Sequence, residues 1–441
     1  MRQTLFFIPH AVFQGPLLIA WLVIGAVVLA YRFRKHGNSN ETWSFLPVFG
    51  IVALVIHFVL PQLEVVGVNP ADPAGDFIKL GLAVRGYGMF LLLAIVSGVS
   101  IILLRCRKSG LTPDDVIGLG FWMMVSGILG ARLFYVIQKS DDFFTGGATI
   151  GGTILSVIDM TKGGLVVYGS LIGAMVAAVV YLKLHKLPLA RTADLIAPGM
   201  VLGLAIGRIG CLMNGCCYGG VCAASLPSVT FPAGSAPYMK QLSEGELIGI
   251  KAIPNPDKDA PHPYVVESVE PSSLASKMGI EEGDEFIVRL PDELYIRYQK
   301  QHPGQKIGDQ ELVGYIETNR LKQLVLPVAQ LPARSLQTHP TQIYSAINAS
   351  LLCLVLWFYW TVRTRDGEVF GLMLILYSIG RFLMELIRQD ELGQFGTQLT
   401  ISQWVSIAMI LIGFAVITFA RPSDFARPSD FEGQHRPVVA S

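Results

Sequence analysis

Four arginines lie in or beside long apolar stretches of the sequence: Arg85, Arg132, Arg208 and Arg381. A charged side chain is costly in such a stretch and usually faces the interior of a helix bundle, where it marks a functional site. Arg381 and Glu385 are four residues apart, so they share one helix face and Glu385 can orient the guanidinium. Several guanidiniums with few acids to neutralise them predict an anionic ligand, and a planar guanidinium suits phosphate. Because the abundant phosphate in a membrane is a lipid head group, these residues predict an intramembrane phospholipid site that faces the outer leaflet.

Each of these arginines also has a purely structural interpretation. The glycines around Arg208 suit close helix packing, but packing does not explain a charge in their midst. Arg381 could form a buried ion pair with Glu385 that binds nothing else. Arg132 fits an ion pair and a site role equally well, and Arg85 fits a membrane anchor at a span entrance. We favour ligand contact for Arg208 and Arg381, and we expect these two side chains to converge on one anionic head group.

Four of the six cysteines form the pattern C-x4-C-C-x4-C: Cys211, Cys216, Cys217 and Cys222. Metal sites usually contain C-x2-C pairs, so the spacing predicts no metal site, and nothing else in the sequence predicts a cofactor. The pattern follows an apolar stretch at its predicted outer end, where the environment permits disulfides. We therefore predict at least one disulfide among the last three cysteines, with Cys222 as a partner. His339 opens the next apolar stretch, either as an ordinary interfacial residue or as part of the site.

The composition indicates a protein that crosses a membrane many times. Hydrophobic residues make up 52% of the 441 residues and charged residues 15%, whereas soluble domains carry about 25% charged residues. The net charge of +1 gives no global field for nucleic acid. A membrane helix needs roughly 20 apolar residues, so we predict an all-α polytopic fold with about nine spans. The predicted spans are 11–31, 43–60, 86–104, 115–137, 164–183, 194–213, 342–362, 369–387 and 400–420.

Lysine and arginine alternate between the two sides of these spans. Positive residues follow the first, third, fifth, seventh and ninth spans, and the other connections contain few near the membrane. Positive residues favour the cytoplasmic side. The pattern therefore predicts an outer N-terminus and a cytoplasmic C-terminus.

A polar, proline-rich insert separates the sixth and seventh predicted spans. We place it at 223–337, between a membrane core of 80–222 and 338–420, with two additional N-terminal spans in 1–79 and a disordered cytoplasmic tail at 421–441. Within the insert, 264–287 predicts a strand, a short helix, a Gly-Asp turn and a strand, and it resembles a PDZ domain. A helix is predicted at 310–319 and a strand at 323–328. The alternative is a small β-rich spacer with no peptide ligand.

The membrane core resembles the bacterial prolipoprotein diacylglyceryl transferase family. Individual motifs are modest, but seven of them in family order are specific. The matching pieces are Arg85–Gly88, Gly130–Tyr135, Gly163–Gly173, Asp194–Pro198, Gly207–Gly210 with Asn214-Gly215, His339–Tyr344 and Gly380–Arg388.

The resemblance implies transfer of a diacylglyceryl group from phosphatidylglycerol to the cysteine thiol of a prolipoprotein signal peptide, at the outer face of the bacterial inner membrane. It matches Arg208 and Arg381 to the family's phosphate-handling arginines. It matches other site positions to Tyr87, Asn214 and Glu385. With these matches, the predicted catalytic residues are Tyr168, Arg381 and Glu385. The predicted substrate-binding residues are Arg208, Tyr87, Asn214, Arg132 and His339.

Four polar positions depart from the family pattern. The chain has Tyr168 where the family has a histidine that is a proposed base, Cys211 where it has Asn, Cys216 where it has Glu, and Ser345 where it usually has Glu. A tyrosine hydroxyl accepts a proton only with help from its surroundings. The alternative function is therefore a non-catalytic phospholipid-binding or lipoprotein-binding membrane protein on the same fold. An intramembrane protease with a PDZ-like insert ranks last. No histidine lies in the His-Glu-x-x-His motif of a metalloprotease, and no histidine lies within a predicted span of the membrane core to partner Ser170 in a serine protease.

Overall fold

The fold is given by a computed structural model that describes residues 4–9, 12, 15–37, 46–54, 56–57, 65–69, 72–140, 143, 157, 164, 166–223, 225–257, 260–289, 313–320, 324–327, 330–388 and 397–422. The chain forms two compact units. Unit 1 consists of residues 1–91, 207–344 and 387–390, and unit 2 consists of residues 92–206, 345–386 and 391–441. The predicted tail beyond residue 422 lies outside the described residues.

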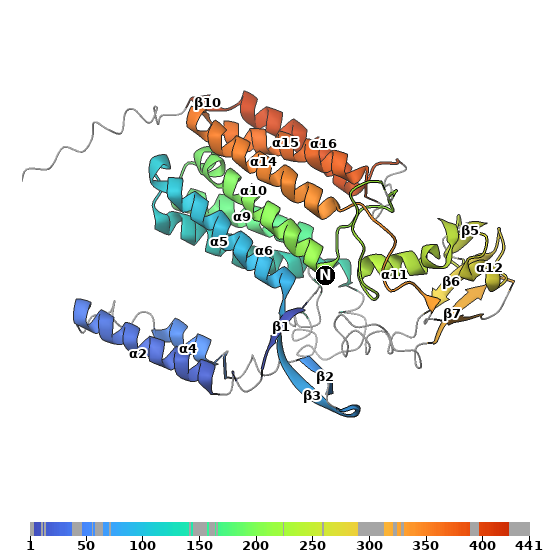
Figure 1. The fold of residues 1–441 in the computed structure, drawn as a ribbon. Helices are drawn as coiled ribbons and strands as arrows, with labels where there is room; N and C mark the ends of the chain where they lie inside the picture. Colours follow the sequence, from blue (N-terminus) through green and yellow to red (C-terminus); the bar gives the residue numbers. More distant parts are fainter. Residues whose placement is uncertain are drawn as a thin grey trace, which may run out of the picture. The chain divides into compact units, whose positions relative to one another are not determined.

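Unit 2 is built from long apolar helices that lie side by side (Figure 1). It contains α6 (Pro113–Gln138), α9 (Val167–Leu184), α15 (Glu368–Glu385) and α16 (Ile401–Thr418), with most of α5 (Gly86–Cys106), α10 (Leu189–Asn214) and α14 (Thr341–Val362). Capping boxes begin two of these helices. Thr112 and Asp115 cap α6, and Thr400 and Gln403 cap α16, so backbone N–H groups that the helix leaves unpaired find side-chain acceptors.

Glycines allow the closest helix contacts in unit 2. A Cβ atom on Gly130 of α6 would collide with the Gly169 carbonyl of α9, and one on Gly371 of α15 would lie 3.0 Å from the Gly413 carbonyl of α16. Small residues of this kind let membrane helices pack backbone against backbone. The core of the unit joins α10, α14 and α15 around Val201, Leu356 and Val369, all fully buried.

A buried ionic network fixes the start of α15. The Asp194 carboxylate accepts hydrogen bonds of 2.8 Å from the backbone N–H groups of Gly367 and Phe370. The Arg363 guanidinium lies 3.5 Å from Asp194. The Arg191 guanidinium pairs with the carboxylate of Asp366 at 2.9 Å. A carboxylate buried in this way needs such partners, so the network explains a strongly polar Asp194 inside an apolar helix.

Seven helices in the described part of the chain are long and apolar enough to cross a membrane, and each coincides with a predicted span. The eighth predicted span coincides with α15, which has 18 residues and carries Glu368, Arg381 and Glu385. In the second predicted span the structure describes a helix at α4 (Leu46–Leu54) and residues 56–57 only. The chain is therefore a multi-pass membrane protein with a small β-rich part.

That β-rich part belongs to unit 1 and lies within the predicted insert. It is a five-stranded antiparallel sheet in the order β4 (Ile250–Pro254), β5 (Tyr264–Val269), β6 (Glu285–Arg289), β7 (Val313–Thr318) and β8 (Leu324–Pro327). The short helices α11 (Ala236–Ser243) and α12 (Leu274–Lys277) accompany it (Figure 1). Its core includes Phe286, Ile316 and Leu326, each no more than 1% exposed.

The structure confirms most of the predicted elements of the insert and corrects one. The strand, short helix, turn and strand predicted over 264–287 are β5, α12, a turn at Gly283 and β6, and the strand predicted at 323–328 is β8. The helix predicted at 310–319 is wrong, because residues 313–318 form β7. Residues 314, 316 and 318 are buried and residues 315 and 317 are not, which is the two-residue period of a strand.

The N-terminal part of unit 1 contains strands that the sequence analysis missed. The predicted first span is α2 (Pro16–His36), and the ring of Trp21 stacks on Phe49 of α4 at 4.6 Å between centroids. The same part of the chain contains a three-stranded antiparallel sheet with the order β1 (Thr4–Ile8), β3 (Asp72–Arg85) and β2 (Val65–Asn69). Strand β3 ends at Arg85 and α5 begins at Gly86, so Arg85 lies at the entrance of the predicted span, at a strand–helix junction.

Candidate active site

Arg208 lies in the last two turns of α10 and belongs to unit 1. Tyr87, in the first turn of α5, packs against the same part of α10, since a Cβ atom on Gly210 would lie 3.4 Å from Tyr87 Cδ2. The Arg208 charge acts on the side chains of Tyr87 and Cys217. Two of the predicted substrate-binding residues, Tyr87 and Arg208, are thus brought together from helices that are far apart in the sequence.

The loop after α10 folds back on the end of that helix. Gly215 has φ 74° and Cys217 has φ 57°, and a positive φ is uncommon for a residue that carries a side chain. The backbone N–H of Cys216 donates to the Cys211 carbonyl at 3.1 Å. Two buried side chains at the start of α14 hold the loop: Gln342 Nε2 donates to the Cys216 carbonyl at 2.7 Å, and Thr341 Oγ1 donates to the Cys217 carbonyl at 2.6 Å.

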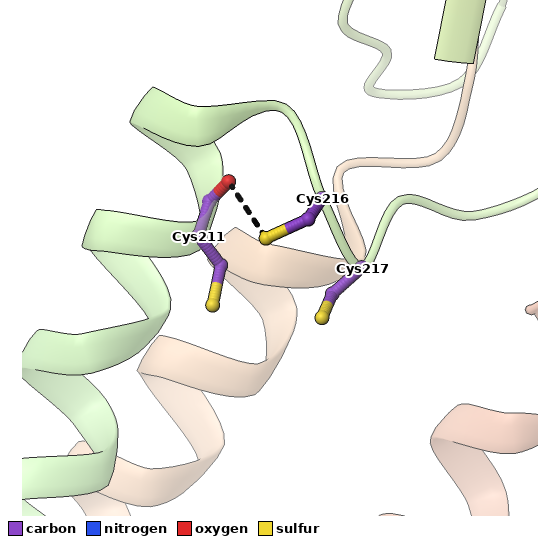
Figure 2. A group of neighbouring side chains, drawn as sticks. All are labelled: Cys211, Cys216 and Cys217. Atoms are coloured by element: carbon purple, nitrogen blue, oxygen red, sulfur yellow. Dashed lines mark hydrogen bonds between the residues drawn. The ribbon is translucent and has the colours of Figure 1, made fainter. Parts of the chain in front are cut away.

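Three thiols meet in this loop. The sulfur atoms of Cys211, Cys216 and Cys217 all lie within 4.8 Å of one another, and Figure 2 shows them at the corners of a triangle. Hydrogen bonds with the thiols of Cys211 and Cys216, helped by the nearby charges of Arg208 and Arg388, lower the pKa of the Cys217 thiol. Asn214 is near enough to hydrogen bond with Cys216. The predicted disulfide among Cys216, Cys217 and Cys222 is not formed, because all three are free thiols.

His339 flanks the same loop. Its backbone carbonyl accepts from the Gly219 N–H at 3.1 Å, and its N–H donates to the Gly220 carbonyl at 3.0 Å. The Nδ1 atom is buried and has no hydrogen-bond partner in the described part of the chain. Unit 1 therefore gathers four predicted substrate-binding residues, Tyr87, Arg208, Asn214 and His339, around the end of α10 and the loop that follows it.

Arg381 and Glu385 form an ion pair in unit 2, one helical turn apart on α15. Arg381 Nη2 also donates to Ser402 Oγ of α16 at 2.9 Å. The side chain of Glu385 is 1% exposed and that of Arg381 is 18% exposed. A guanidinium carries five N–H donors, so the two contacts orient it and leave donors for a ligand. The sequence-based expectation that Glu385 orients Arg381 is consistent with this geometry.

Arg132 and Tyr168 also belong to unit 2, at the contact of α6 with α9. Arg132 is buried, and its guanidinium donates to the backbone carbonyls of Val157 at 2.8 Å and Gly164 at 3.2 Å. It therefore binds the backbone at Val157 and at Gly164, three residues before α9 begins. Tyr168 is the second residue of α9 and is 42% exposed. The next residue, Gly169, packs against the backbone of Gly130 on α6, and this contact holds the first turn of α9, which carries Tyr168, against α6.

Sequence reasoning missed several polar residues that shape these two groups. Thr341 and Gln342 anchor the cysteine loop, and Ser402 holds Arg381. Thr341 and Gln342 stand in the motif His339–Tyr344, so that motif was their only signal in the sequence. Ser402 carried none, because it contacts a residue 21 positions away.

Comparison with known proteins supports one family. The profile of the prolipoprotein diacylglyceryl transferase family matches residues 76–419. A phosphatidylglycerol–prolipoprotein diacylglyceryl transferase from Rhodopirellula baltica is 36% identical over 443 aligned residues, which cover 93% of this chain and 87% of the relative. Proteins of the same name from Clostridium tetani and Ralstonia pickettii are 24% and 26% identical and cover 78% and 79% of this chain.

The extent of these matches shows how much of the insert and of the N-terminal region is shared with a relative. Because the alignment with the Rhodopirellula baltica protein covers 93% of this chain, it includes most of the insert and of the N-terminal region. The family profile alone covers well over half of the chain, from before α5 to beyond α16. The chain belongs to the prolipoprotein diacylglyceryl transferase family.

Proposed function

We propose that this protein transfers the diacylglyceryl group of phosphatidylglycerol to the cysteine thiol of prolipoprotein signal peptides. The observation that carries the proposal is a family match from residue 76 to residue 419, within which Arg208 and Arg381 lie in apolar helices. In the reaction the thiol sulfur forms a bond to a glycerol carbon, and the bond from that carbon to the phosphate oxygen breaks. Glycerol phosphate leaves with the electron pair, and the thiol proton passes to a base or to the leaving phosphate.

The arginines suit the leaving group in this reaction. Negative charge builds up on the phosphate as the carbon–oxygen bond breaks, and a fixed guanidinium stabilises that charge more in the transition state than in the bound lipid. Arg381 is oriented by Glu385 and Ser402, and Arg208 stands beside Tyr87. We assign phosphate binding to both arginines, and a supporting role in the same binding to Tyr87, Asn214 and His339. Arg132 binds the backbone carbonyls of Val157 and Gly164.

The alternative function is phospholipid or lipoprotein binding without turnover. The observation that favours it is Tyr168, which stands where the family has a histidine. The direct test is to express the protein in cells depleted of their own transferase. Gain of a diacylglyceryl mass on the cysteine of a prolipoprotein supports the transferase, and an unmodified prolipoprotein with intact phosphatidylglycerol binding supports the alternative.

Replacing Tyr168 by Phe separates the two functions. If the tyrosine hydroxyl relays the thiol proton, turnover should fall by about 10²-fold, the lower end of the range for acid–base groups, while phosphatidylglycerol binding persists. Tyr181→Phe, on the same helix near its other end, is the matched control and should leave turnover unchanged. Single-turnover transfer measured beside lipid binding gives both readouts. Unchanged turnover in Tyr168→Phe would remove the hydroxyl from the mechanism.

We also propose that the insert faces the periplasm of a cell with an inner membrane and that residues 421–441 face the cytoplasm. The support is the alternation of lysine and arginine across the predicted spans. Phosphatase fusions at residue 257 of the insert should be active, and those at residue 435 inactive. Fluorescent-protein fusions at the two positions, which need the cytoplasm, should give the opposite pattern. Cytoplasmic behaviour at residue 257 would overturn the orientation and the outer location of the site.

A peptide ligand for the insert is a separate proposal. The support is the resemblance of 264–287 to a PDZ domain and a five-stranded sheet whose outer strands are β4 and β8. PDZ domains bind an extended peptide as an added strand. The test is to select binding peptides with the whole protein from a library of random C-terminal peptides. The control is the Lys251→Glu variant on the edge strand β4. If the parent enriches no peptides over this variant, the insert is a spacer.

A further inference from the structure

The structure brings the sulfur atoms of three cysteines of unit 1 together. Two of them stand at positions where the family pattern has a polar residue. Cys211 lies in the last turn of α10, and Cys216 and Cys217 lie in the loop after it (Figure 2). All three sulfurs are within 4.8 Å of one another. The thiols replace the Asn and Glu that the family has at positions 211 and 216, so this part of the site has lost oxygen and nitrogen groups and gained sulfur.

The spacing of the sulfurs fits a metal ion. A zinc–sulfur bond is about 2.3 Å long, so the edge of a tetrahedral zinc–thiolate site is roughly 3.8 Å. Sulfur atoms within 4.8 Å reach that spacing by small rotations of the side chains. Three protein ligands with a fourth position left open are the arrangement of catalytic zinc sites, whereas structural sites use four.

The loop that carries the thiols is held in place by its backbone. Cys217 has a positive φ, and the Cys216 N–H bonds to the Cys211 carbonyl. Gln342 and Thr341, each 1% exposed, bind the carbonyls of Cys216 and Cys217. A site whose ligands are fixed before the ion arrives loses little entropy on binding.

The charges around the cluster suit an anionic metal–thiolate group. Three thiolates and one zinc ion carry a net charge of −1, and a fourth thiolate would bring it to −2. Arg208 lies on α10 one turn before Cys211, so a positive charge is carried by the same end of the helix as the thiols.

We propose that Cys211, Cys216 and Cys217 bind a zinc ion whose fourth position takes the cysteine thiol of the prolipoprotein and activates it as a nucleophile. The inference rests on the proposed transferase function. On coordination the substrate thiol releases its proton to solvent, because a thiol bound to zinc is deprotonated. The zinc-bound sulfur then attacks the glycerol carbon, the carbon–oxygen bond breaks, and glycerol phosphate leaves. The product thioether is a neutral, weaker ligand and dissociates.

This site supplies what the sequence departures removed. A zinc-bound thiolate is a nucleophile without a protein base, so the reaction no longer needs the histidine that Tyr168 replaces. The leaving phosphate is charged as it departs, and Arg208 lies one turn before Cys211 on α10. The nucleophile and one phosphate-binding group are thus both carried by the end of α10 and its loop.

Zinc binding to the full-length, reduced protein in detergent tests the site without any lipid substrate. Titration against a coloured zinc chelator should give one zinc ion per chain. Serine at position 211, 216 or 217 should weaken binding at least tenfold, whereas Cys222→Ser and Cys353→Ser, outside the cluster, should bind like the parent. X-ray absorption should show three sulfurs at the metal. Stoichiometric zinc binding that survives in the triple serine variant, or a disulfide between two of the three cysteines in the protein as isolated, would overturn the site.

Transfer to a prolipoprotein peptide tests the role of the ion. Chelator-treated protein should lose at least tenfold in turnover and recover it with added zinc, and the Cys222→Ser variant should respond in the same way. Phosphatidylglycerol binding by the Cys216→Ser variant shows that it is folded. Full transfer in the chelated protein would overturn the zinc role and leave the transferase function standing. Zinc binding with no transfer under any condition would instead contradict the transferase function and with it the thiol activation.

Discussion

Changing Arg381 to Lys is expected to lower diacylglyceryl transfer nearly as much as changing it to Ala. Lysine keeps the positive charge but loses the planar set of N–H donors with which arginine binds phosphate. In this protein the geometry of the guanidinium is set on two sides, by the ion pair with Glu385 and by a 2.9 Å hydrogen bond to Ser402. An ammonium has three donors on a single nitrogen, so it does not reproduce the planar arrangement that bridges these partners and the phosphate. Loss of a charge-assisted contact costs on the order of 2–3 kcal/mol, or roughly 30- to 150-fold in rate.

The measurement is transfer to a prolipoprotein peptide with phosphatidylglycerol in excess, so that a change in rate is separated from a change in lipid affinity. Arg365→Lys is the matched control, since Arg365 is an exposed arginine of the same unit, between α14 and α15. It should transfer at the parental rate. If Arg381→Lys also transferred at that rate, the charge alone would suffice and the orientation by Glu385 would be a feature of helix packing.

Most of the membrane fold could be predicted from the sequence because each element depends on a local property. A span needs only a run of about 20 apolar residues, so the ends of α5, α14 and α16 fall within a few residues of the predicted spans. The arginines were found for the same reason, since a charge in an apolar run stands out without knowledge of its neighbours.

Elements that depend on distant partners could not be predicted in this way. Strand β1 pairs with β3, and Thr4 faces Arg85 across that pair, 81 positions away. The residues around Thr4 do not by themselves predict that this segment pairs with a strand so far along the sequence. The helix predicted at 310–319 failed for a related reason, because β7 is a strand only when β6 and β8 cover its two edges.

The cysteine cluster shows how backbone geometry can defeat a spacing rule. The pattern C-x4-C-C lacks the C-x2-C pairs of most metal sites. The left-handed turn at Gly215 and Cys217 shortens the path between Cys211 and the later cysteines, so that three thiols meet despite the unfavourable spacing. A positive φ at a glycine can be anticipated, but one at Cys217 requires the loop to be held by Gln342 and Thr341 from another helix.

Arg208→Ala is expected to lower both phosphatidylglycerol binding and transfer by roughly 30- to 150-fold, the value of a lost charge-assisted contact. Arg208 stands beside Tyr87 at the end of α10, and the glycine before it leaves the backbone open to a close approach by lipid. Equilibrium binding of a fluorescent phosphatidylglycerol and the transfer assay together measure both losses. Arg289→Ala, which breaks an exposed ion pair with Glu317 on the insert, is the control and should change neither.

The double variant Arg208→Ala with Arg381→Ala tests the sequence-based prediction that both arginines bind one phosphate. Residues that share a ligand group are not additive, because the first loss already removes part of what the second residue held. The double variant should therefore bind phosphatidylglycerol more tightly than the product of the two single losses allows. Independent losses that multiply would place the arginines on different anions. If both single variants bound phosphatidylglycerol like the parent, Arg208 and Arg381 would be structural ion-pair residues. A guanidinium in an apolar helix costs a few kcal/mol, so it is kept only where a partner offsets that cost.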